Sequence, residues 1–379
     1  MKKIMFVFGT RPEAIKMAPL VKAVEATDDL EALVVVTAQH REMLDQVLTL
    51  FDVHPSYDLN LMKPGQSLTD ITAGVLRGIE DIVKKEQPDL VLVHGDTTTT
   101  FAGALASFYQ QVPIGHVEAG LRSGNMYSPF PEEANRRLTG ALTSIHFSPT
   151  SQARENLLRE GIDPSIIYTT GNTVIDALMM TVNDHYELSD ELAKALDVPG
   201  RKVLLTTHRR ENIGEPMAHI FDAVCQLHDR FEDVHFYFPV HMNPKVRDLA
   251  KEKLGKLERV HMFEPLDYAP FTNLINRMDL VLTDSGGLQE EAPAVGKPVL
   301  VLRDNTERPE AVDAGTVRLV GSNTQVIFET VENLFTDDEA YAIMKHAVNP
   351  YGDGHACERI IEGIRHYFGL IEKRPEDWR

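Results

Sequence analysis

Short apolar runs alternate with longer amphipathic segments along the first half of the chain. The apolar runs are residues 4–8, 32–37, 89–94, 114–117 and 145–148, and the segments between them include residues 14–26, 42–50, 98–109 and 132–142. Runs of this length predict strands, and the segments predict helices. Because parallel strands must be joined by crossovers, the alternation predicts a parallel sheet with helices on both faces. We expect residues 145–148 to form its last strand.

The alternation pauses near Gly171 and then starts again. Five further apolar runs predict a second sheet: residues 202–206, 235–239, 260–263, 280–283 and 298–302. A chain of 379 residues also exceeds what one hydrophobic core usually serves. We therefore expect two doubly wound α/β domains, residues 1–170 and 171–355, with a hinge near residue 170. In the remaining segment, 356–379, apolar residues at helical spacing predict a helix that crosses back onto the first domain.

The composition argues against several classes of partner. Acidic residues outnumber basic ones 57 to 38, for a formal net charge of -19, which disfavours nucleic acid or an anionic membrane surface. No apolar stretch approaches the roughly 20 residues that span a bilayer, and the first apolar run stops at Gly9, too soon for a signal peptide. Cys225 and Cys357 offer neither a disulfide framework nor a metal cluster. We expect a cytoplasmic protein without a bound metal.

A glycine-rich turn follows the predicted strand at residues 280–283. Its residues Ser285, Gly286 and Gly287 lead into a short helical stretch, and such a turn presents bare backbone N–H groups to an anion, most naturally a phosphate. Glu291 comes slightly later in the same helix, where its carboxylate can accept hydrogen bonds from sugar hydroxyls. The turn is therefore typical of a nucleotide-sugar site.

Positive side chains also follow predicted strands. Arg11 and Lys16 lie at a strand end and in the first turn of a helix, where their charge opposes the helix dipole unless Glu13 neutralises it. An anionic ligand or plain surface charge would explain them. His208 follows the first strand of the second half, beside Arg209 and Arg210. It could be a solvated loop side chain or, with two arginines next to it, a diphosphate ligand. The turns lack the dinucleotide fingerprint, so no nicotinamide cofactor is indicated.

Two further side chains each allow two interpretations. Arg308 follows a predicted strand and could bind phosphate, or it could pair with the neighbouring Glu307 or Glu310. Phe271 could stack on a base or fill the core. The pattern alone leaves both choices open.

Three carboxylates follow successive predicted strands of the first half: Asp96, Glu118 and Glu132. Each has a structural alternative. Asp96 could cap a helix, Glu118 could pair with Arg122 or its neighbours, and Glu132 could be favoured by the helix dipole alone. Because the carboxyl ends of parallel strands meet at one edge of a sheet, the three could also share catalytic work in one cleft. Both interpretations stay open from spacing alone.

A set of motifs, found in order along the chain, resembles the bacterial non-hydrolysing UDP-N-acetylglucosamine 2-epimerases. The motifs are Gly9-Thr10-Arg11-Pro12-Glu13, His94-Gly95-Asp96, His116-Val117-Glu118-Ala119-Gly120-Leu121-Arg122, Phe130-Pro131-Glu132-Glu133, Thr207-His208-Arg209-Arg210-Glu211-Asn212, Asp284-Ser285-Gly286-Gly287 and Glu307-Arg308-Pro309-Glu310. The resemblance implies the GT-B fold, with two Rossmann-like domains and an active-site cleft between them. It also implies a cytoplasmic homodimer that needs no cofactor and interconverts UDP-GlcNAc and UDP-ManNAc, for cell-envelope polysaccharide or teichoic acid synthesis.

The resemblance also implies roles for individual residues. The UDP portion would be bound by Arg11, Lys16, His208, Phe271, Ser285, Gly286, Gly287, Glu291 and Arg308. Asp96, Glu118 and Glu132 would act on the sugar, and His208 would stabilise the departing diphosphate. An allosteric site for a second substrate molecule would use Gln39, His40, Gln66, Arg209 and His241. One departure is visible: some relatives have a Gln where this chain has Glu264-Pro265-Leu266-Asp267.

Three other activities would use a similar nucleotide site. A hydrolysing 2-epimerase would release free ManNAc and UDP, and a GT-B glycosyltransferase would pass the sugar to an acceptor. A UDP-sugar sensor would bind without catalysis. The chain shows no appended kinase domain, which favours the non-hydrolysing epimerase, and three acids around the donor sugar are not what a transferase needs.

Overall fold

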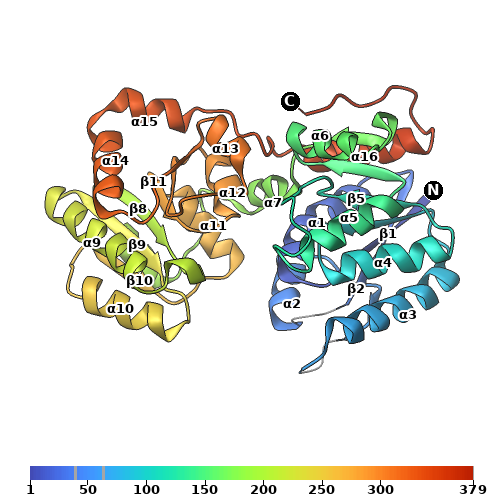
Figure 1. Cartoon of the computed structure of the whole chain (residues 1–379), viewed down its shortest axis with the longest axis horizontal. Coiled ribbons are helices and arrows are strands. Elements are labelled where there is room, and N and C mark those ends of the chain that lie inside the picture. The colour runs from blue at the N-terminus through green and yellow to red at the C-terminus, as the bar shows by residue number, and fades with distance from the viewer. Residues whose placement is uncertain (38–40, 62–64, 379) are drawn as a thin grey trace. The chain divides into compact units, whose positions relative to one another are not determined.

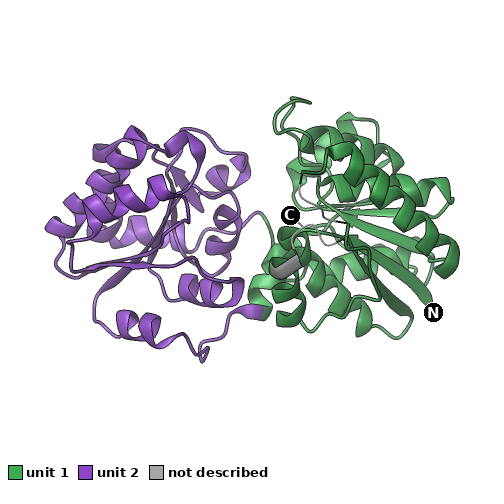
Figure 2. Cartoon of the chain, turned by 90° about the horizontal axis from the view of Figure 1, so that it is seen from below, with its two compact units in different colours: residues 1–180, 351–379 green, residues 181–350 purple. Residues whose placement is uncertain are grey.

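The computed structural model describes residues 1–37, 41–61 and 65–378. Contacts divide the chain into two compact units, coloured separately in Figure 2: unit 1 holds residues 1–180 and 351–379, and unit 2 holds residues 181–350. Helix α7 (Thr173–Thr181) leads from unit 1 to the start of unit 2.

Unit 1 is built on a seven-stranded parallel sheet in the order β3-β2-β1-β4-β5-β6-β7. The strands are β1 (Lys2–Phe8), β2 (Leu30–Val36), β3 (Tyr57–Asp58), β4 (Leu90–His94), β5 (Ile114–Val117), β6 (Ile145–Ser148) and β7 (Ile167–Thr169). The helices are α1 (Arg11–Glu25), α2 (Arg41–Leu50), α3 (Leu68–Glu86), α4 (Thr98–Tyr109), α5 (Glu132–Leu142), α6 (Ser151–Arg159), the 3-10 turn η1 (Pro164–Ile166), α7 and α16 (Ala356–Tyr367). Helices α3, α4 and α5 pack as neighbours, while α1 packs with α2 and α16 (Figure 1).

Unit 2 repeats the same plan with a six-stranded parallel sheet in the order β10-β9-β8-β11-β12-β13. The strands are β8 (Arg201–Thr206), β9 (Val234–Pro239), β10 (Val260–Phe263), β11 (Leu280–Thr283), β12 (Val299–Val301) and β13 (Val317–Leu319). The helices are α8 (Asp190–Leu196), η2 (Arg210–Asn212), α9 (Glu215–Arg230), α10 (Pro244–Leu254), α11 (Tyr268–Asn276), α12 (Leu288–Ala294), α13 (Pro309–Asp313), α14 (Thr324–Thr336) and α15 (Asp338–Lys345). In both units the central pair of strands, β1 with β4 and β8 with β11, marks the point where the strand order reverses.

The central strands are apolar along their length because helices cover both faces of each sheet. Residues 4–8 of β1 and 90–93 of β4 are fully buried. In unit 1 they pack against the apolar faces of α3 and α4, which contribute Val75, Ile79 and Ala102. The predicted α/β fold with two parallel sheets is therefore confirmed. Ligands of such sheets bind beyond the carboxyl ends of the strands.

The prediction that residues 145–148 form the last strand of the first sheet was wrong. Strand β7 (Ile167–Thr169) pairs outside β6 and forms the edge. The end of the chain covers this edge, since the Trp378 N–H donates to the Thr169 carbonyl at 2.7 Å and the Thr169 N–H donates to the Asp377 carboxylate at 2.8 Å. A strand of three residues is too short to give a recognisable pattern.

The final helix belongs to unit 1. Helix α16 packs against α1, the Arg365 guanidinium pairs with Asp29 at 2.9 Å, and the Tyr168 hydroxyl and His366 Nδ1 are 2.8 Å apart. Contacts place the unit boundaries after residues 180 and 350, whereas the domain boundaries predicted from the sequence fall after residues 170 and 355. Those domain boundaries stay predictions. Of the helices that the structure describes, none has both the length and the apolar character that crossing a membrane requires.

Candidate active site

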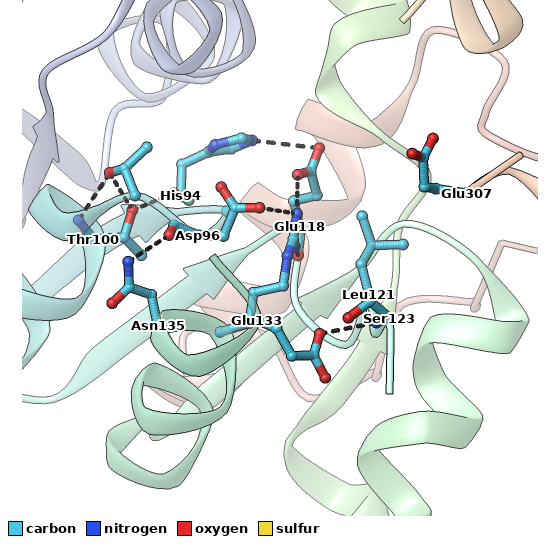
Figure 3. A network of polar contacts seen from close by, with 12 residues as sticks. His94, Asp96, Thr100, Glu118, Leu121, Ser123, Glu133, Asn135 and Glu307 are labelled. Carbon is cyan, nitrogen blue, oxygen red and sulfur yellow. Dashed lines mark hydrogen bonds and ion pairs between the residues drawn. The ribbon is translucent and has the colours of Figure 1, made fainter. Parts of the chain in front are cut away.

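The loops after β1, β4 and β5 meet at the carboxyl edge of the sheet in unit 1. They bring Asp96 and Glu118 together with Lys16 of α1 and Arg136 of α5. Figure 3 shows the carboxylates of Asp96 and Glu118 in one network with His94. This is the edge where doubly wound sheets bind their ligands.

Glu118 is the centre of this cluster. Its side chain is only 5% exposed, and its Oε2 pairs with Lys16 and accepts from the Asn172 amide at 3.0 Å. Oε1 lies 3.4 Å from Arg136, which also donates to the Glu118 carbonyl at 3.3 Å. Burial alone would raise the pKa of Glu118, but the cations Lys16 and Arg136 overcome it and hold that pKa well below its usual range. Glu118 is therefore a carboxylate at neutral pH.

The backbone of Glu118 is left-handed, with φ at 63°. For a residue with a long side chain this conformation costs about 1 kcal/mol, and the surrounding contacts must offset that cost. Arg136 contributes by holding both the carbonyl and the carboxylate of Glu118. The alternative pairing of Glu118 with Arg122 is wrong, because Arg122 pairs with Glu160 at 2.7 Å.

Arg136 also reaches the second acid. Its guanidinium lies 2.6 Å from the Asp96 carboxylate, so one arginine bridges Asp96 and Glu118. The Asp96 carbonyl accepts from the Asn135 amide at 2.9 Å (Figure 3). The capping alternative for Asp96 is wrong, because Thr97 is the N-cap of α4 and its hydroxyl accepts from the Thr100 N–H at 3.2 Å.

Glu132 is the first residue of α5, one helical turn before Arg136. Its side-chain Oε2 is buried, and within the described ranges it has no hydrogen-bond partner. The dipole alternative fits its place at the helix start, but a buried oxygen without a partner is costly unless a ligand supplies one. The structure thus places Glu132 on the helix that carries Arg136, outside the ion pairs of Asp96 and Glu118.

His94 was not foreseen as part of this cluster. It lies at the end of β4 with Nε2 3.7 Å from Glu118 Oε2, and neither ring nitrogen has a hydrogen-bond partner among the described residues. Burial lowers the pKa of His94 to about 3. The ring is therefore neutral. Arg136 and Asn172 were also missed, although the four-residue spacing from Glu132 could have placed Arg136 on the same helical face.

The two cations near the start of α1 have different surroundings. Glu13 does not neutralise them, because its carboxylate completes the capping box by accepting from the Gly9 and Thr10 N–H groups at 3.0 and 2.8 Å. Lys16 pairs with Glu118. Arg11, the first residue of α1, is half-buried and stays a candidate phosphate ligand.

In unit 2, the loop after β8 is organised by a buried carboxylate. Asp284 follows β11, and its Oδ2 accepts from the Thr207 hydroxyl, the N–H groups of His208 and Arg209, and the Asn212 amide, at 2.9 to 3.0 Å. Its Oδ1 lies 3.4 Å from His208 Nδ1. Burial lowers the pKa of His208, with Asp284 acting in the opposite direction. Asp284 therefore fixes His208 and Arg209 at the carboxyl edge of this sheet.

The glycine-rich turn lies beside that loop. A Cβ on Gly286 would come 3.5 Å from the Arg209 guanidinium, and a Cβ on Gly287 would come 3.4 Å from Glu291 Oε2. The turn leads into α12, with Gly287 at its N-cap position. Ser285, Gly286, Gly287, Glu291, His208 and Arg209 thus form one cluster in unit 2, as expected of a nucleotide site.

The structure bears on the two interpretations of Arg308 and on those of Phe271. Arg308 pairs with the buried Glu290 of α12. The Glu307 carboxylate pairs instead with Arg303 at 2.9 Å, whereas pairing of Arg308 with Glu310 stays a prediction. Phe271 lies on α11 and is half-buried, so both of its interpretations stay open.

The predicted activator residues are only partly described. Gln39 and His40 lie outside the described residues. Gln66 is half-buried just before α3 in unit 1. In unit 2, the exposed His241 ring stacks on His208 with centroids 5.4 Å apart, next to Arg209. Among the residues that the structure describes, no group of three His, Cys, Asp or Glu side chains could hold a metal ion.

Comparisons with known proteins agree on one family. Residues 22–365 match the family described as UDP-N-acetylglucosamine 2-epimerase. The UDP-N-acetylglucosamine 2-epimerase of Bacillus subtilis is 52% identical over 378 residues, covering 99% of this chain and 98% of its own. A co-structure of S. aureus MnaA with UDP matches with a TM-score of 0.89, at 52% identity and over 100% of both chains. The UDP-GlcNAc 2-epimerase of Neisseria meningitidis bound to UDP-GlcNAc matches with a TM-score of 0.84, at 49% identity, over 96% of this chain and 99% of that one. The chain belongs to the UDP-N-acetylglucosamine 2-epimerase family.

Proposed function

We propose that the protein interconverts UDP-GlcNAc and UDP-ManNAc by inverting C2 of the sugar, without net hydrolysis. Family membership and the UDP-GlcNAc bound to the Neisseria meningitidis relative support the substrate. The observation that carries the proposal is the pair of acids, Asp96 and Glu118, bridged by Arg136 at a strand-end edge. Two acids could take the C2 proton from one face and return it to the other, a step that neither transfer nor sensing requires.

The chemistry needs a good leaving group because the C2–H bond has no adjacent carbonyl to make it acidic. In the proposed forward reaction the bond between C1 and the diphosphate oxygen breaks, and UDP leaves with the electron pair. A carboxylate then takes the C2 proton, and the C1–C2 double bond of 2-acetamidoglucal forms. Re-addition of UDP to C1 and protonation of C2 from the opposite face give UDP-ManNAc.

The residues of unit 2 would hold the diphosphate as its charge develops. His208 and Arg209 are fixed by Asp284, and the turn of Ser285, Gly286 and Gly287 lies beside Arg209. Donors that are already oriented stabilise developing charge most effectively. Glu291 would accept from the ribose hydroxyls, Phe271 would contact uracil, and Arg11, Lys16 and Arg308 would complete the UDP site.

The acids of unit 1 would act on the sugar. Because Glu118 is held in its ionised form, it suits a proton acceptor or a group that stabilises the positive charge at C1. We assign Asp96 as the acid/base at C2, Glu118 as a second acid/base or a stabiliser of the positive charge, and Glu132 as support for them. The buried Oε2 of Glu132 would gain its hydrogen bond from the substrate.

Four broader features belong to the same proposal. The active site would lie in a cleft between the two Rossmann-like domains, 1–170 and 171–355, and close over the intermediate to exclude water. The enzyme would work as a cytoplasmic homodimer. A second substrate molecule would activate it through Gln39, His40, Gln66, Arg209 and His241. Its product would supply ManNAc units for a cell-envelope polysaccharide or teichoic acid.

Incubation with UDP-GlcNAc alone in D2O tests the proposed function. We expect UDP-ManNAc with deuterium at C2, and we expect Asp96→Asn to reduce the rate by at least about 100-fold, the scale of lost general acid–base catalysis. Proton NMR and mass spectrometry of the products measure both. Free ManNAc would instead indicate hydrolysis, and unchanged UDP-GlcNAc would favour transfer or sensing.

A further inference from the structure

Two segments of unit 1 lie side by side next to the point where the chain leaves for unit 2 and returns. The Asn172 N–H donates to the Tyr351 carbonyl at 2.7 Å. Gly171 has φ at 86°, and a Cβ on it would come 3.3 Å from the Gly352 Cα. The two backbones are therefore in direct contact, and the main chain of Asn172 is fixed from both sides.

Both the oxygen and the nitrogen of the Asn172 side-chain amide make hydrogen bonds. It is 3% exposed, and its Oδ1 accepts from the Val174 N–H at 3.3 Å, at the start of α7. Its Nδ2 donates to Glu118 Oε2 at 3.0 Å. An aspartate could serve the helix equally well, but it would place a second negative charge against Glu118. The position therefore needs an amide because of Glu118, not because of the helix.

The other groups that face Glu118 come from three different elements. They are Lys16 from α1, His94 from β4 and Arg136 from α5. Lys16 and Asn172 both meet Oε2, while Arg136 approaches Oε1. Among the described residues, Asn172 is the neutral donor to this carboxylate. A hydrogen bond to the charged form favours that form and fixes the orientation of the carboxylate.

We propose that Asn172 is a positioning residue for the reaction, which holds Glu118 ionised and in one orientation through its amide. This inference rests on the proposed function and adds a residue that the sequence motifs do not include. Asn172 acts through Glu118 and does not touch the substrate. Because its backbone is held by Tyr351, the amide is oriented before substrate binds.

Two substitutions separate this role from helix capping. Asn172→Ser and Asn172→Asp both keep an oxygen that can cap α7, but serine withdraws the donor from Glu118 and aspartate adds a like charge. Asn273→Ser is the matched control: Asn273 is also buried, and it donates to the carbonyls of Thr181 and Ala269 at 3.1 and 2.8 Å. Asn273 and both of these partners belong to unit 2.

The measurement is kcat and KM for UDP-GlcNAc from pH 9 down to the lowest pH at which the protein stays folded, because the pKa of Glu118 lies well below its usual range. We expect Asn172→Asp to lower kcat at least about tenfold and Asn172→Ser to lower it about threefold, with KM within about twofold. The acidic limb of the kcat profile of Asn172→Ser should move to higher pH, because the carboxylate has lost a donor. Asn273→Ser should lower the unfolding midpoint and leave the profile in place. Unchanged profiles in both Asn172 variants, or the same shift in the control, would overturn the inference.

The positioning role of Asn172 can also be tested if the proposed function is wrong. Should the unmodified protein make no UDP-ManNAc, the titration of Glu118 itself decides. Carbon-13 NMR of protein labelled at glutamate carboxyl carbons gives that titration, with the Glu118 signal identified by its loss in Glu118→Gln. A higher midpoint in Asn172→Ser supports the positioning role, and an identical midpoint rejects it.

Discussion

Glu118 shows how a single side chain is prepared for chemistry. Its backbone is left-handed, its carboxylate is buried, and two cations hold it ionised. Burial raises the pKa of Glu118 and ion pairing lowers it, and ion pairing has the larger effect. Such a carboxylate can accept a proton only when the substrate perturbs the cations or brings a strong acid close to it.

Arg136 should be essential because it bridges both acids. Arg136→Leu leaves Asp96 and Glu118 without their shared cation, so we expect kcat/KM to fall on the order of 100-fold, as misplacement of catalytic groups does. The acidic limb of the pH profile should also move upward, since Glu118 loses a charge that lowers its pKa. Steady-state kinetics across pH measures both effects.

The neighbouring arginine provides the control for that prediction. Arg137 pairs with Glu133 at 3.0 Å and its side chain is 40% exposed, so Arg137→Leu removes a charge from the same helix without touching the acids. We expect its kcat/KM within about twofold of the unmodified protein. Equal losses in the two variants would show that Arg136 matters only for folding.

At the scale of secondary structure, neighbouring strands of unit 1 carry buried histidines. His94, His116 and His146 lie on β4, β5 and β6, and His116 and His146 are register partners. Burial is the main cause that lowers the pKa of each, to about 4 for His146. The native state keeps these rings neutral, whereas the unfolded chain takes up protons below about pH 6.5. Stability is therefore complete above pH 6.5 and falls as the pH drops toward 4.

His146→Phe should remove part of that acid sensitivity. From the two pKa values, the ring costs about 2 kcal/mol of stability at pH 5 relative to pH 7, so the variant should lose that much less on acidification. Urea unfolding at the two pH values measures it. His54→Phe is the control, because the His54 side chain is 88% exposed. A pH slope equal to that of the unmodified protein in His146→Phe would mean that the ring is already protonated at pH 5.

The loop after β8 should depend on Asp284. Asp284→Asn replaces an acceptor of four donors by a group that is itself half donor, so we expect unit 2 to lose about 3 kcal/mol and UDP affinity to fall at least about tenfold. Calorimetric titration with UDP measures the affinity. Asp279→Asn is the matched control at the opposite end of β11, where Asp279 accepts from the Lys202 N–H at 2.8 Å. UDP binding that is equally weak in both variants would argue against a specific role for the loop.

The sequence predicted the central elements well and the edges poorly. Residues 114–117, 145–148, 260–263 and 280–283 form strands with the predicted bounds, because buried strands are continuous apolar runs. The edge strands β3, β7 and β13 were missed. They have only two or three residues each, and an edge strand is defined by its partner more than by its own side chains.

The sequence predicted individual residues of the candidate site, but not which of them contact each other. Asp96 and Glu118 stand out because they follow strands. Their shared partner Arg136 sits mid-helix, and Asn172 follows the edge strand β7. Which cation meets which acid depends on contacts between residues far apart in the sequence. Spacing along one chain carries no such information.

Over the whole chain, the C-terminal segment covers the β7 edge of the sheet in unit 1. Arg374 donates to the carbonyls of Ser165 and Ile167, and its guanidinium lies 4.2 Å from the centre of the Tyr168 ring. Because an uncovered edge strand exposes unpaired backbone groups, this tail protects β7. It also joins residues that are far apart in the sequence.

Arg374→Ala should therefore destabilise the protein by about 1–2 kcal/mol, the scale of a few hydrogen bonds to a charged donor with a cation–π contact. Lys373→Ala is the control, since the Lys373 side chain is 85% exposed. Urea midpoints compare the two. A midpoint for Arg374→Ala that matches Lys373→Ala would mean that the tail contributes nothing to the stability of unit 1.

In the proposed reaction the bond between C1 and the diphosphate breaks and re-forms. The most direct test is UDP-GlcNAc labelled with oxygen-18 at the bridging position between C1 and the β-phosphorus, analysed by phosphorus NMR after partial turnover. We expect the label to scramble into the non-bridging positions of the β-phosphate, because the β-phosphate of the departed UDP can rotate before it returns. UDP-ManNAc that keeps all of its label in the bridge would argue against cleavage of this bond.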